Sequence, residues 1–421
     1  MRADTTARPG TGAGLRRVLI VLCSTEIISW GILYYAFPVL LPTISAQTGW
    51  SLAAITAGFS ASQIVAGLVG VPVGKLLDRR GPRAIMTTGS IVAVPALIML
   101  ETAQSLVWFT IAWLLIGVAM AGVFYAPAFA ALTRWYGARR VSALTALTLV
   151  AGLASTVFAP LTAVLNTHLD WRGTYLVLAG ILAVTTVPLH LFGLRLPWPE
   201  IEHEAEHHPS AVARSRPFIV LTISMSLAAF SVYAVVVNLV PLLTERGMST
   251  SAAAVALGLG GVGQVLGRLG YARLAARTSV RTRTALVLLA SAVVTTLLGV
   301  IPGPALLLIA GSVLAGVARG IFTLVQATAI TDRWGAVHYG QLSGLLAVPV
   351  MLTAAIAPWA GSAMAAWLGG YPAVFVVLGV IGVLAAVLST ASVPRQSSSS
   401  ATRPRTRRSM SSRIGRTDSM P

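Results

Sequence analysis

Charged residues are scarce in this chain of 421 residues, in which Asp, Glu, Lys and Arg together make up 10%. Soluble globular proteins have about 25%, whereas 56% of this chain is hydrophobic and its mean hydropathy is +0.81. Cysteine is nearly missing as well. Cys23 stands alone, which excludes a secreted scaffold held by internal disulfides. We therefore predict an integral membrane protein.

Acidic residues are also few, and the 12 that occur leave a net charge of +18. Such a charge can indicate a nucleic-acid partner, but the arginines lie in short clusters between long apolar runs and at the two chain ends. This distribution is typical of a polytopic membrane protein. We expect the lipid bilayer as the partner of the chain, with a secondary attraction to anionic lipid, and no nucleic acid.

Motifs of pumps and enzymes are missing too. No GxxxxGK[ST] loop occurs, which excludes a nucleotide-driven pump. No Ser/His/Asp arrangement accompanies a plausible catalytic fold, so we predict neither an enzyme nor a cofactor. His203, His207 and His208 gather with four glutamates, where a solvated charged linker is a better interpretation than a metal site.

Long apolar runs are what the chain does have. A helix needs about 20 apolar residues to cross a hydrocarbon core about 30 Å thick. Twelve runs qualify: 18–44, 51–73, 84–102, 105–132, 141–165, 172–194, 217–243, 250–274, 284–302, 305–331, 341–367 and 372–393. The first run is too long for the apolar region of a signal peptide, and no small-residue cleavage site follows it.

The positions of Lys and Arg predict the orientation of these spans. With the N-terminus in the cytoplasm, 26 of the 30 basic residues fall on cytoplasmic segments and two, Arg172 and Arg246, on outer loops. Basic residues favour the cytoplasmic side, so both termini are expected there. With 29 arginines against one lysine and much alanine, the composition is typical of a GC-rich genome. We predict a multi-pass protein of a bacterial inner membrane.

The two halves of the chain resemble each other at a spacing of about 199 residues. Arg134-Trp135 recurs as Arg333-Trp334, and Ala159-Pro160 recurs as Ala357-Pro358. The fold class predicted is therefore an all-α membrane protein of twelve transmembrane helices in two pseudo-symmetric six-helix bundles. Repeats of this kind bind substrate between the halves and rock to expose it alternately to each side.

The same repeat sets the expected domain organisation. The segments are a cytoplasmic N-terminal tail (1–17), a first six-helix bundle (18–195), a cytoplasmic linker (196–216), a second bundle (217–393) and a disordered cytoplasmic tail (394–421). The tail is rich in Ser, Arg and Thr, for which a solvated segment is a better interpretation than a regulatory or lipid-contacting one. We expect the chain to function as a monomer.

Residues 74–83, between the second and third spans, read GKLLDRRGPR. They resemble the signature of the major facilitator superfamily, glycine-x-leucine-x-aspartate-arginine-x-glycine-arginine-arginine. The matching residues are Gly74, Leu76, Asp78, Arg79, Gly81 and Arg83, and Pro82 replaces one arginine. With twelve spans and the internal repeat, the resemblance covers essentially the whole chain.

By this resemblance, Gly74, Asp78, Arg79, Gly81 and Arg83 form a conformational latch rather than a substrate site. Gly74 is expected to allow close approach of a helix from the other half. Asp78 is expected to face the N-terminal end of such a helix and to pair with a nearby arginine such as Arg83. The alternative is a simple topogenic loop, which leaves the aspartate unexplained. In the second half, Ala276 stands at the aspartate position, so packing is the expected role there.

Ionisable residues inside a span are costly and mark functional sites by default. Glu26, Arg268 and Arg319 lie inside spans, and Arg319 is the deepest cation. Two arginines against one glutamate leave an excess positive charge, which favours an anionic substrate. Two alternatives remain: a Glu26–Arg319 salt bridge, and an Arg268 side chain that reaches the cytoplasmic interface.

A second resemblance concerns Arg268 and the stretch 49–63, GWSLAAITAGFSASQ. Both look like the monocarboxylate porter and oxalate–formate antiporter branch, in which an arginine of the eighth helix binds the substrate carboxylate. Arg268 stands at that position. The aspartate that precedes this arginine in monocarboxylate porters is Gln264 here, and the span 341–367 has no Lys or Arg to match the lysine of oxalate exchangers.

Other polar residues within spans complete the predicted site. Tyr34, Tyr125, Tyr233, Asn238 and Gln326 are candidate substrate contacts beside Arg268 and Arg319, although the aromatic residues equally suit packing or interfacial anchoring. Glu26, the one carboxylate well inside a span, is the candidate for proton coupling because burial favours its neutral form. Glu26, Trp30 and Tyr34 are spaced to share one helix face.

The sequence therefore predicts a secondary active transporter for a small organic anion, such as a monocarboxylate, coupled to protons or working by exchange. The main alternative is proton-driven efflux of drugs or secondary metabolites. The stretch GLASTVFAP (152–160) only partly resembles the drug-antiporter signature, because the glycines after Pro160 are missing. A transporter-like ligand sensor is a further alternative.

Overall fold

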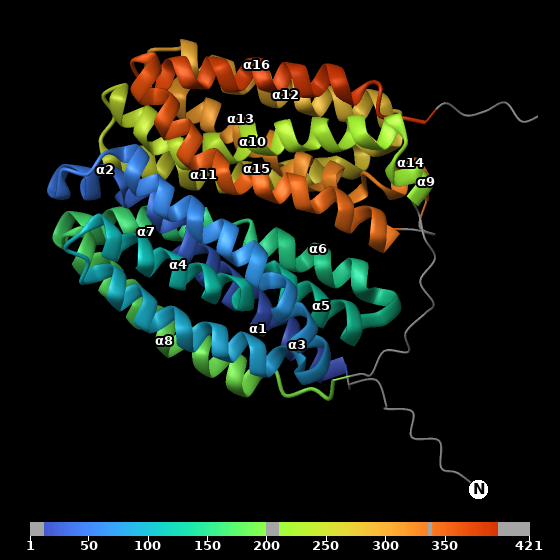
Figure 1. Ribbon diagram of the computed structural model, residues 1–421, viewed down its shortest axis with the longest axis horizontal. Helices are drawn as coiled ribbons and strands as arrows, with labels where there is room; N and C mark the ends of the chain where they lie inside the picture. Colours follow the sequence, from blue (N-terminus) through green and yellow to red (C-terminus); the bar gives the residue numbers. More distant parts are fainter. Residues whose placement is uncertain (1–11, 199–209, 336–338, 395–421) are drawn as a thin grey trace, which may run out of the picture.

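The computed structural model describes residues 12–198, 210–335 and 339–394, and these residues form a bundle of long helices joined by short turns (Figure 1). No strand occurs within these ranges. Most of the predicted tails and of the linker, including His203, His207 and His208, lies outside the described residues.

The first half contains eight α-helices. They are α1 (Gly12–Trp30), α2 (Ala36–Thr48), α3 (Leu52–Glu101), α4 (Leu106–Val123), α5 (Tyr125–Tyr136), α6 (Arg140–Ala151), α7 (Ala154–His168) and α8 (Trp171–Pro188). A π-helical turn, Gly31–Tyr35, joins α1 to α2, and a second one, Leu189–Gly193, follows α8.

The second half follows after the linker. Its helices are α9 (Ser210–Ala213), α10 (Arg216–Glu245), α11 (Thr250–Arg277), α12 (Val280–Val300), α13 (Ala305–Thr328), α14 (Thr331–Trp334), α15 (Tyr339–Leu368) and α16 (Tyr371–Ser389). The short helices α9 and α14 lie at the same end of the bundle, on the right in Figure 1.

Eleven helical segments of the described chain are long and apolar enough to cross a membrane. One of them, α3, has 50 residues, which at 1.5 Å per residue amounts to about 75 Å, far more than one crossing needs. Gly81 interrupts α3 with φ 77° and ψ 169°, a backbone conformation open to glycine. The two parts correspond to the predicted spans 51–73 and 84–102, so the twelve-helix prediction is confirmed.

Two of the predicted spans are broken at positions that prolines explain. Pro127 has no N–H to donate to the carbonyl of Val123, so α4 ends there and Phe124 takes an extended conformation with ψ −172°. Pro38 likewise leaves the carbonyl of Tyr34 without its helical donor, and the π-helical turn ends at Tyr35. The rings of Trp30 and Phe124 stack 4.1 Å apart, which packs the two breaks against each other.

The internal repeat is visible in how helices begin. Ser51 accepts a hydrogen bond from the backbone N–H of Ala54 at 3.2 Å, and Ser249 accepts one from Ala252 at the same distance. These serines occupy equivalent positions in the two halves. Each satisfies a backbone donor that the first turn of a helix leaves free.

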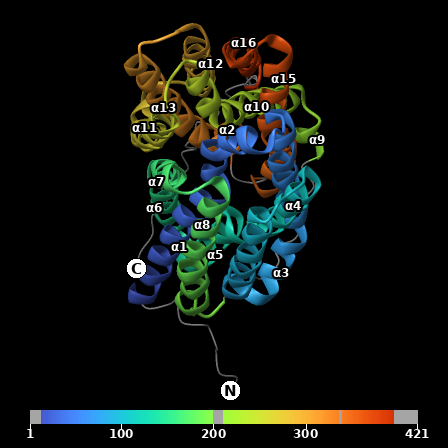
Figure 2. The same cartoon turned by 90° about the vertical axis from the view of Figure 1, so that its left-hand side faces the viewer.

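Helices α1–α8 and α10–α16 form two groups that meet along one interface (Figures 1 and 2). Small residues allow their close contact. Thr156 on α7 donates to the carbonyl of Gly258 on α11 at 2.8 Å, and Ser60 on α3 accepts from the backbone N–H of Trp359 on α15 at 3.1 Å. Toward the end that carries α9 and α14, a side chain added at Gly74, Gly270 or Gly344 would meet nothing within 4 Å. Neither group makes a close contact at these three glycines.

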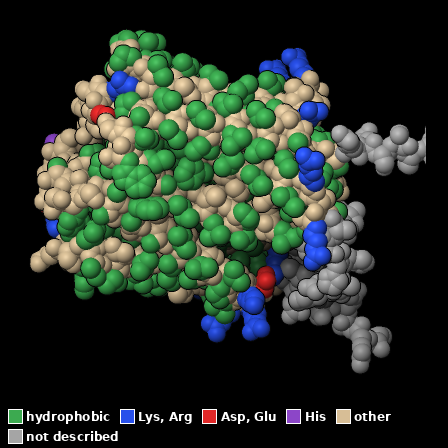
Figure 3. All heavy atoms as spheres, turned by 45° about the horizontal axis from the view of Figure 1, so that its top comes forward, with side chains coloured by type: hydrophobic (Ala, Val, Ile, Leu, Met, Phe, Trp, Pro, Cys, Tyr) green, Lys and Arg blue, Asp and Glu red, His purple; other side chains and the backbone are tan. Residues whose placement is uncertain are grey.

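The outer surface suits a bilayer. Apolar side chains cover the middle of the face shown in Figure 3, and most of the Lys and Arg side chains visible there lie at the end nearest the grey segments. Large aliphatic side chains such as Leu306 and Val184 are 74% and 73% exposed. Exposed apolar surface of this extent is expected where lipid replaces water.

Candidate functional site

A cavity of about 70 Å³ lies between the two groups of helices. We call it the central cavity. Six of the seven predicted substrate contacts line it: Tyr34, Tyr125, Tyr233, Arg268, Arg319 and Gln326. Trp30, Tyr35, Gln264 and Thr323 line it too. Side chains predicted from five separate spans therefore meet in one place.

Arg268 reaches from α11 to the other group of helices. Its Nη1 atom donates a hydrogen bond to the carbonyl oxygen of Thr148 on α6, and its side chain is 7% exposed. The helical chain is interrupted between α6 and α7, at Gly152 and Leu153. A Cβ atom at Gly152 would lie 2.9 Å from Nη1 of Arg268, so glycine leaves room for the guanidinium. The alternative in which Arg268 extends to the interface is wrong.

Arg319, on α13, is held from one side by an uncharged partner. Its Nη2 atom donates to Oε1 of Gln264 at 2.8 Å, and its guanidinium carbon lies 5.8 Å from the centre of the Tyr35 ring. That distance is within the range of a cation–π interaction. Its Nε atom is buried without a hydrogen-bond partner in the described part of the chain.

Neither arginine of the central cavity has a carboxylate partner. Among the described residues, the ion pairs are Arg134–Asp78 and Arg283–Asp332. The Glu26–Arg319 salt bridge considered as an alternative is therefore not formed. Two guanidinium groups that share a cavity without a counter-charge attract an anion, because an unpaired cation in a low dielectric is costly.

Aromatic side chains form one wall of the central cavity. Trp30 lies 5.4 Å from Tyr34 and 5.0 Å from Tyr125, measured between ring centres. The Tyr34 hydroxyl is buried and has no hydrogen-bond partner among the described residues. Trp30 and Tyr34 thus lie on one side of the helix, as predicted. The bend in the chain at Phe124 places Tyr125 beside them.

Asn238 does not line the central cavity. It is fully buried, and its Nδ2 donates to the carbonyl of Ala234 at 2.8 Å while its Oδ1 accepts from Ser362 at 2.8 Å. Ser362 belongs to α15, so Asn238 joins α10 to α15. The amide is occupied by protein groups on both sides.

Glu26 is also absent from the lining of the central cavity. It is 0% exposed, and neither of its carboxylate oxygens has a hydrogen-bond partner in the described chain. The Trp30 indole N–H and the Ser29 hydroxyl, both close to Glu26 in sequence, are likewise buried and unpartnered. The buried carboxyl group lies one to two turns along the helix from the cavity wall.

A larger cavity of about 510 Å³ adjoins the central one, and we call it the vestibule. The two share Trp30, Tyr34, Tyr233 and Gln326. Its lining continues along α3 from Gln63 to Val71 and along α15 from Ala355 to Ala347, toward the end that carries α9 and α14. The vestibule is therefore a path from that end to the two arginines.

The motif at the α3 turn makes a different ion pair from the one predicted. Asp78 pairs with Arg134 at the end of α5, not with Arg83, whose Nε donates to the carbonyl of Leu191 at 2.8 Å. The choice of partner depends on α5, which starts afresh after the break at Phe124. Gly74 makes no close approach to the other group of helices, and Arg79 is exposed.

Trp198 covers this ion pair. Its indole Nε1 donates to the carbonyl of Asp78 at 3.0 Å, and the guanidinium of Arg134 lies 4.3 Å from its ring centre. A Cβ atom at Gly81 would lie 3.2 Å from the same ring. The chain that leaves α8 is thereby held against the motif.

The second half has a counterpart with the charges exchanged. Arg283, at the start of α12, pairs with Asp332 on α14, next to the repeated Arg333-Trp334. Arg333 donates from Nη2 to the hydroxyl of Ser392 at 3.0 Å. Burial lowers the pKa of the Arg333 guanidinium to about 10, and the Asp332 carboxylate opposes this shift.

Some residues in contact with the two cavity arginines were not predicted as site residues. Gln264 accepts a hydrogen bond from Arg319, and the Tyr35 ring lies beside its guanidinium. Thr148 accepts a hydrogen bond from Arg268, and Gly152 leaves space for that side chain. The sequence signal for Gln264 was its place four residues before Arg268, on the same helix face. A backbone carbonyl acceptor such as that of Thr148 leaves no signal of its own.

Comparisons with known proteins agree with this architecture. The family model of the Major Facilitator Superfamily matches residues 22–305 and 221–416. Monocarboxylate transporter 13 of Rattus norvegicus is 26% identical over 355 residues, which cover 81% of this chain and 74% of that protein. Monocarboxylate transporter 11 of Homo sapiens is 26% identical over 302 residues, covering 69% of this chain and 59% of that protein.

Two solved structures are similar in fold. A bacterial homolog of the human lysosomal transporter Spinster, in its inward-facing and unoccupied conformation, has a TM-score of 0.72 with 15% identity and covers 91% of this chain and 98% of its own. The nucleoside transporter NupG has a TM-score of 0.68 with 14% identity, covering 89% and 98%. At these identities the likeness concerns the fold alone.

Proposed function

The chain belongs to the Major Facilitator Superfamily, and on that basis we propose that it carries a small organic anion, such as a monocarboxylate, by alternating access of the central cavity. It is a multi-pass membrane transporter rather than an enzyme. The substrate, the coupled ion and the movement of the two halves are the parts that we propose.

One observation carries the choice of an anion. Arg268 and Arg319 line the same cavity, and no Asp or Glu of the described residues lines it with them. A carboxylate can accept paired hydrogen bonds from a guanidinium group. The similarity to two monocarboxylate transporters supports a substrate with one carboxylate.

The movement of the substrate follows from the two cavities. The vestibule runs toward the central cavity from the end that carries α9 and α14, and at the other end Pro160 packs against Gly258, 3.3 Å from where a Cβ atom would stand. With both termini in the cytoplasm, the vestibule faces inward. Release and rebinding on the other side then require the halves to close at α9 and α14 and to part at the opposite end.

Glu26 is proposed as the proton carrier. Its carboxyl group is fully buried and makes no ion pair in the described part of the chain, so protonation removes a charge whose burial is costly. The protein is further proposed to act as a monomer in a bacterial inner membrane. If transport works by exchange instead, the inward movement of one anion is coupled to the outward movement of another, and no proton is needed.

The test is uptake of labelled short carboxylates by proteoliposomes, with and without an imposed pH gradient. Arg268→Gln and Arg319→Gln are compared with Arg277→Gln, a control on α11 whose arginine is exposed. We expect saturable, gradient-stimulated uptake in wild type and in the control, and its loss in both cavity variants. Uptake that is absent for every carboxylate, or unaffected by both variants, would overturn the proposal.

Drug efflux remains the second candidate because of the vestibule. Its lining is apolar and includes Met120, Met351 and Trp30, and flexible methionine side chains suit ligands of varied shape. Export of an amphipathic cation from everted vesicles, unchanged in Arg268→Gln and Arg319→Gln, would favour this function. Binding of a ligand without any transport would instead indicate a sensor.

A further inference from the structure

The vestibule has an open side between α3 and α15. The two helices are in contact at Gly67, where a Cβ atom would lie 2.5 Å from the terminal methyl group of Met351. One turn nearer the end that carries α9 and α14, a Cβ atom at Gly70 would meet nothing within 4 Å. The vestibule is lined there by Gly70 and Val71 of α3 and by Ala347 of α15. We call the opening between these three residues the side gap.

The rim of the side gap belongs to the apolar outer surface. Val71 is 65% exposed and Met351 is 44% exposed, although both line the vestibule. Leu68 and Val348, each three residues earlier on the same helices, are exposed as well, and this spacing places them on the same helix faces. The apolar wall of the vestibule is therefore continuous with surface that faces lipid. A hydrocarbon chain can pass from the bilayer into the vestibule along apolar side chains.

Basic side chains continue the same face of α3. Lys75 and Arg79 follow Val71 at intervals of four residues, so all three lie on one side of the helix. Lys75 and Arg79 are exposed, and neither takes part in an ion pair within the described residues. The carboxylate of Asp78, which is near them in sequence, pairs with Arg134. Two unpaired positive charges therefore follow the apolar part of α3, where an anionic lipid headgroup would lie.

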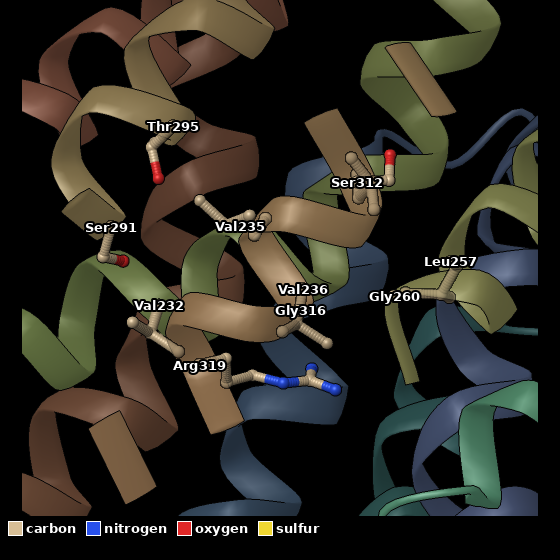
Figure 4. A pocket seen from close by; sticks show the side chains of 12 residues that line it. Val232, Val235, Val236, Leu257, Gly260, Ser291, Thr295, Ser312, Gly316 and Arg319 are labelled. Atoms are coloured by element: carbon tan, nitrogen blue, oxygen red, sulfur yellow. The ribbon is translucent and has the colours of Figure 1, made fainter. Parts of the chain in front are cut away.

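The small cavity beside Arg319 offers no comparable space. It lies among α10, α11, α12 and α13 and has a volume of about 30 Å³ (Figure 4). A single water needs about 10–15 Å³ of this measure, so the cavity holds about two or three waters. The vestibule, with about 510 Å³, is within the range of about 300–1,000 Å³ that is typical of pockets for whole small ligands. It therefore has room for a segment of an acyl chain.

We infer that the side gap binds an anionic phospholipid. One acyl chain enters the vestibule between Val71 and Ala347 and extends toward Phe124, which lines the vestibule at the break between α4 and α5. The headgroup phosphate lies at Lys75 and Arg79. The orientation proposed above places this lipid in the cytoplasmic leaflet, whose surface is negatively charged. The inference does not depend on which substrate the protein carries.

Photo-crosslinking tests this site in the full-length protein. The probe is phosphatidylglycerol with a diazirine near the methyl end of one acyl chain, added to phosphatidylcholine liposomes that contain the protein. Mass spectrometry measures labelling of Phe124 relative to Val184, which lies on the lipid-facing surface of α8. Because the probe is present in both leaflets, the result is independent of the orientation of the protein. A phosphatidylcholine probe with the same acyl chain tests the headgroup.

Two variants separate the acyl chain from the headgroup. Gly70→Phe fills the side gap, and Gly180→Phe on α8 is its matched control, because a Cβ atom at either glycine meets nothing within 4 Å. Lys75→Gln removes one headgroup charge. Its control is Arg277→Gln, which removes an exposed charge from α11.

Wild type is expected to show labelling of Phe124, more strongly with the phosphatidylglycerol probe than with the phosphatidylcholine probe. Gly70→Phe is expected to abolish this labelling while that of Val184 continues, and Gly180→Phe is expected to retain both. Lys75→Gln is expected to lower labelling of Phe124 by the phosphatidylglycerol probe about fivefold, the effect of one basic residue at an anionic headgroup. Labelling by the phosphatidylcholine probe should change little.

Three results would overturn the inference. The first is labelling of Val184 without Phe124 in wild type, which would mean that no acyl chain enters the vestibule. The second is equal labelling of Phe124 in Gly70→Phe and Gly180→Phe, which would exclude entry through the side gap. The third is equal labelling of Phe124 by the two probes in wild type, which would exclude selection of an anionic headgroup. Each of them leaves the proposed transport of an anion untouched.

Discussion

The Arg268 guanidinium donates a hydrogen bond to the carbonyl oxygen of Thr148, and this bond joins the two halves of the molecule at the edge of the central cavity. A carboxylate is a stronger acceptor for a guanidinium than a neutral carbonyl. An anion bound as proposed would therefore compete with Thr148 for Arg268. Under the proposed function, binding of the substrate would loosen this contact between α6 and α11 and so link occupancy of the cavity to the relative movement of the halves.

Arg268→Lys tests whether the geometry of the guanidinium matters as well as its charge. Lysine cannot offer a paired donor set to a carboxylate. We expect the KM for a short carboxylate to rise about ten- to a hundredfold, the cost of a charge-assisted hydrogen bond. Initial rates of uptake by proteoliposomes measure this. A KM within twofold of wild type would show that Arg268 acts only as a distant charge.

Gly152→Ala tests the space that Arg268 occupies. The added methyl group would lie 2.9 Å from Nη1 of Arg268, so the guanidinium must move away from Thr148. We expect a higher KM with little change in protein yield, because Gly152 has an ordinary helical backbone with φ −60°. Gly180→Ala on α8, where a methyl group meets nothing within 4 Å, is the control. Equal kinetics in the two variants would contradict this account of Gly152.

Asp78→Asn tests the ion pair with Arg134. Because the Asp78 side chain is 61% exposed, we expect thermal stability in detergent to change by no more than about 1 kcal/mol. The balance between the two open states should change more, and in the same direction as in Arg134→Gln. Labelling of a cysteine introduced at Gly74, in an otherwise cysteine-free background, measures that balance. Opposite shifts in the two variants would exclude a shared role.

Glu26→Gln tests proton coupling. Glutamine resembles the protonated carboxyl group, so the variant is fixed in the neutral form. We expect exchange of internal for external substrate to continue while stimulation by a pH gradient is lost. Counterflow and gradient-driven uptake are measured on the same vesicles. Retained stimulation would assign the proton to another group.

The spans and most of the cavity residues could be predicted because lipid imposes simple rules. A run of about 20 apolar residues is visible in the sequence. A charged residue inside such a run, such as Arg319, is costly and therefore indicates a functional site. Asn238 obeys the same rule, yet its amide donates to Ala234 within α10 and accepts from Ser362 of α15. Sequence alone does not separate a polar group that awaits a ligand from one that is already satisfied.

Pairings across the fold were harder to predict than positions along the chain. Asp78 has three arginines within five residues, but its partner is Arg134, 56 residues away. That choice depends on the break of the α4–α5 span at Phe124, which sets the direction of α5. Glu26 and Arg319 have opposite charges and similar depth, but Arg319 bonds to Gln264 instead. The sequence predicts how deep a residue lies in the membrane, but the packing of the helices decides which residues it contacts.

Equilibrium binding of a labelled short carboxylate to the purified protein tests the central claim most directly. Wild type is compared with Arg268→Gln, Arg319→Gln and the exposed control Arg277→Gln. The account predicts saturable binding in wild type and in the control, and loss of binding in both cavity variants. Binding that survives in both cavity variants would contradict it, because the two unpaired arginines of the central cavity would then have no part in recognising the anion.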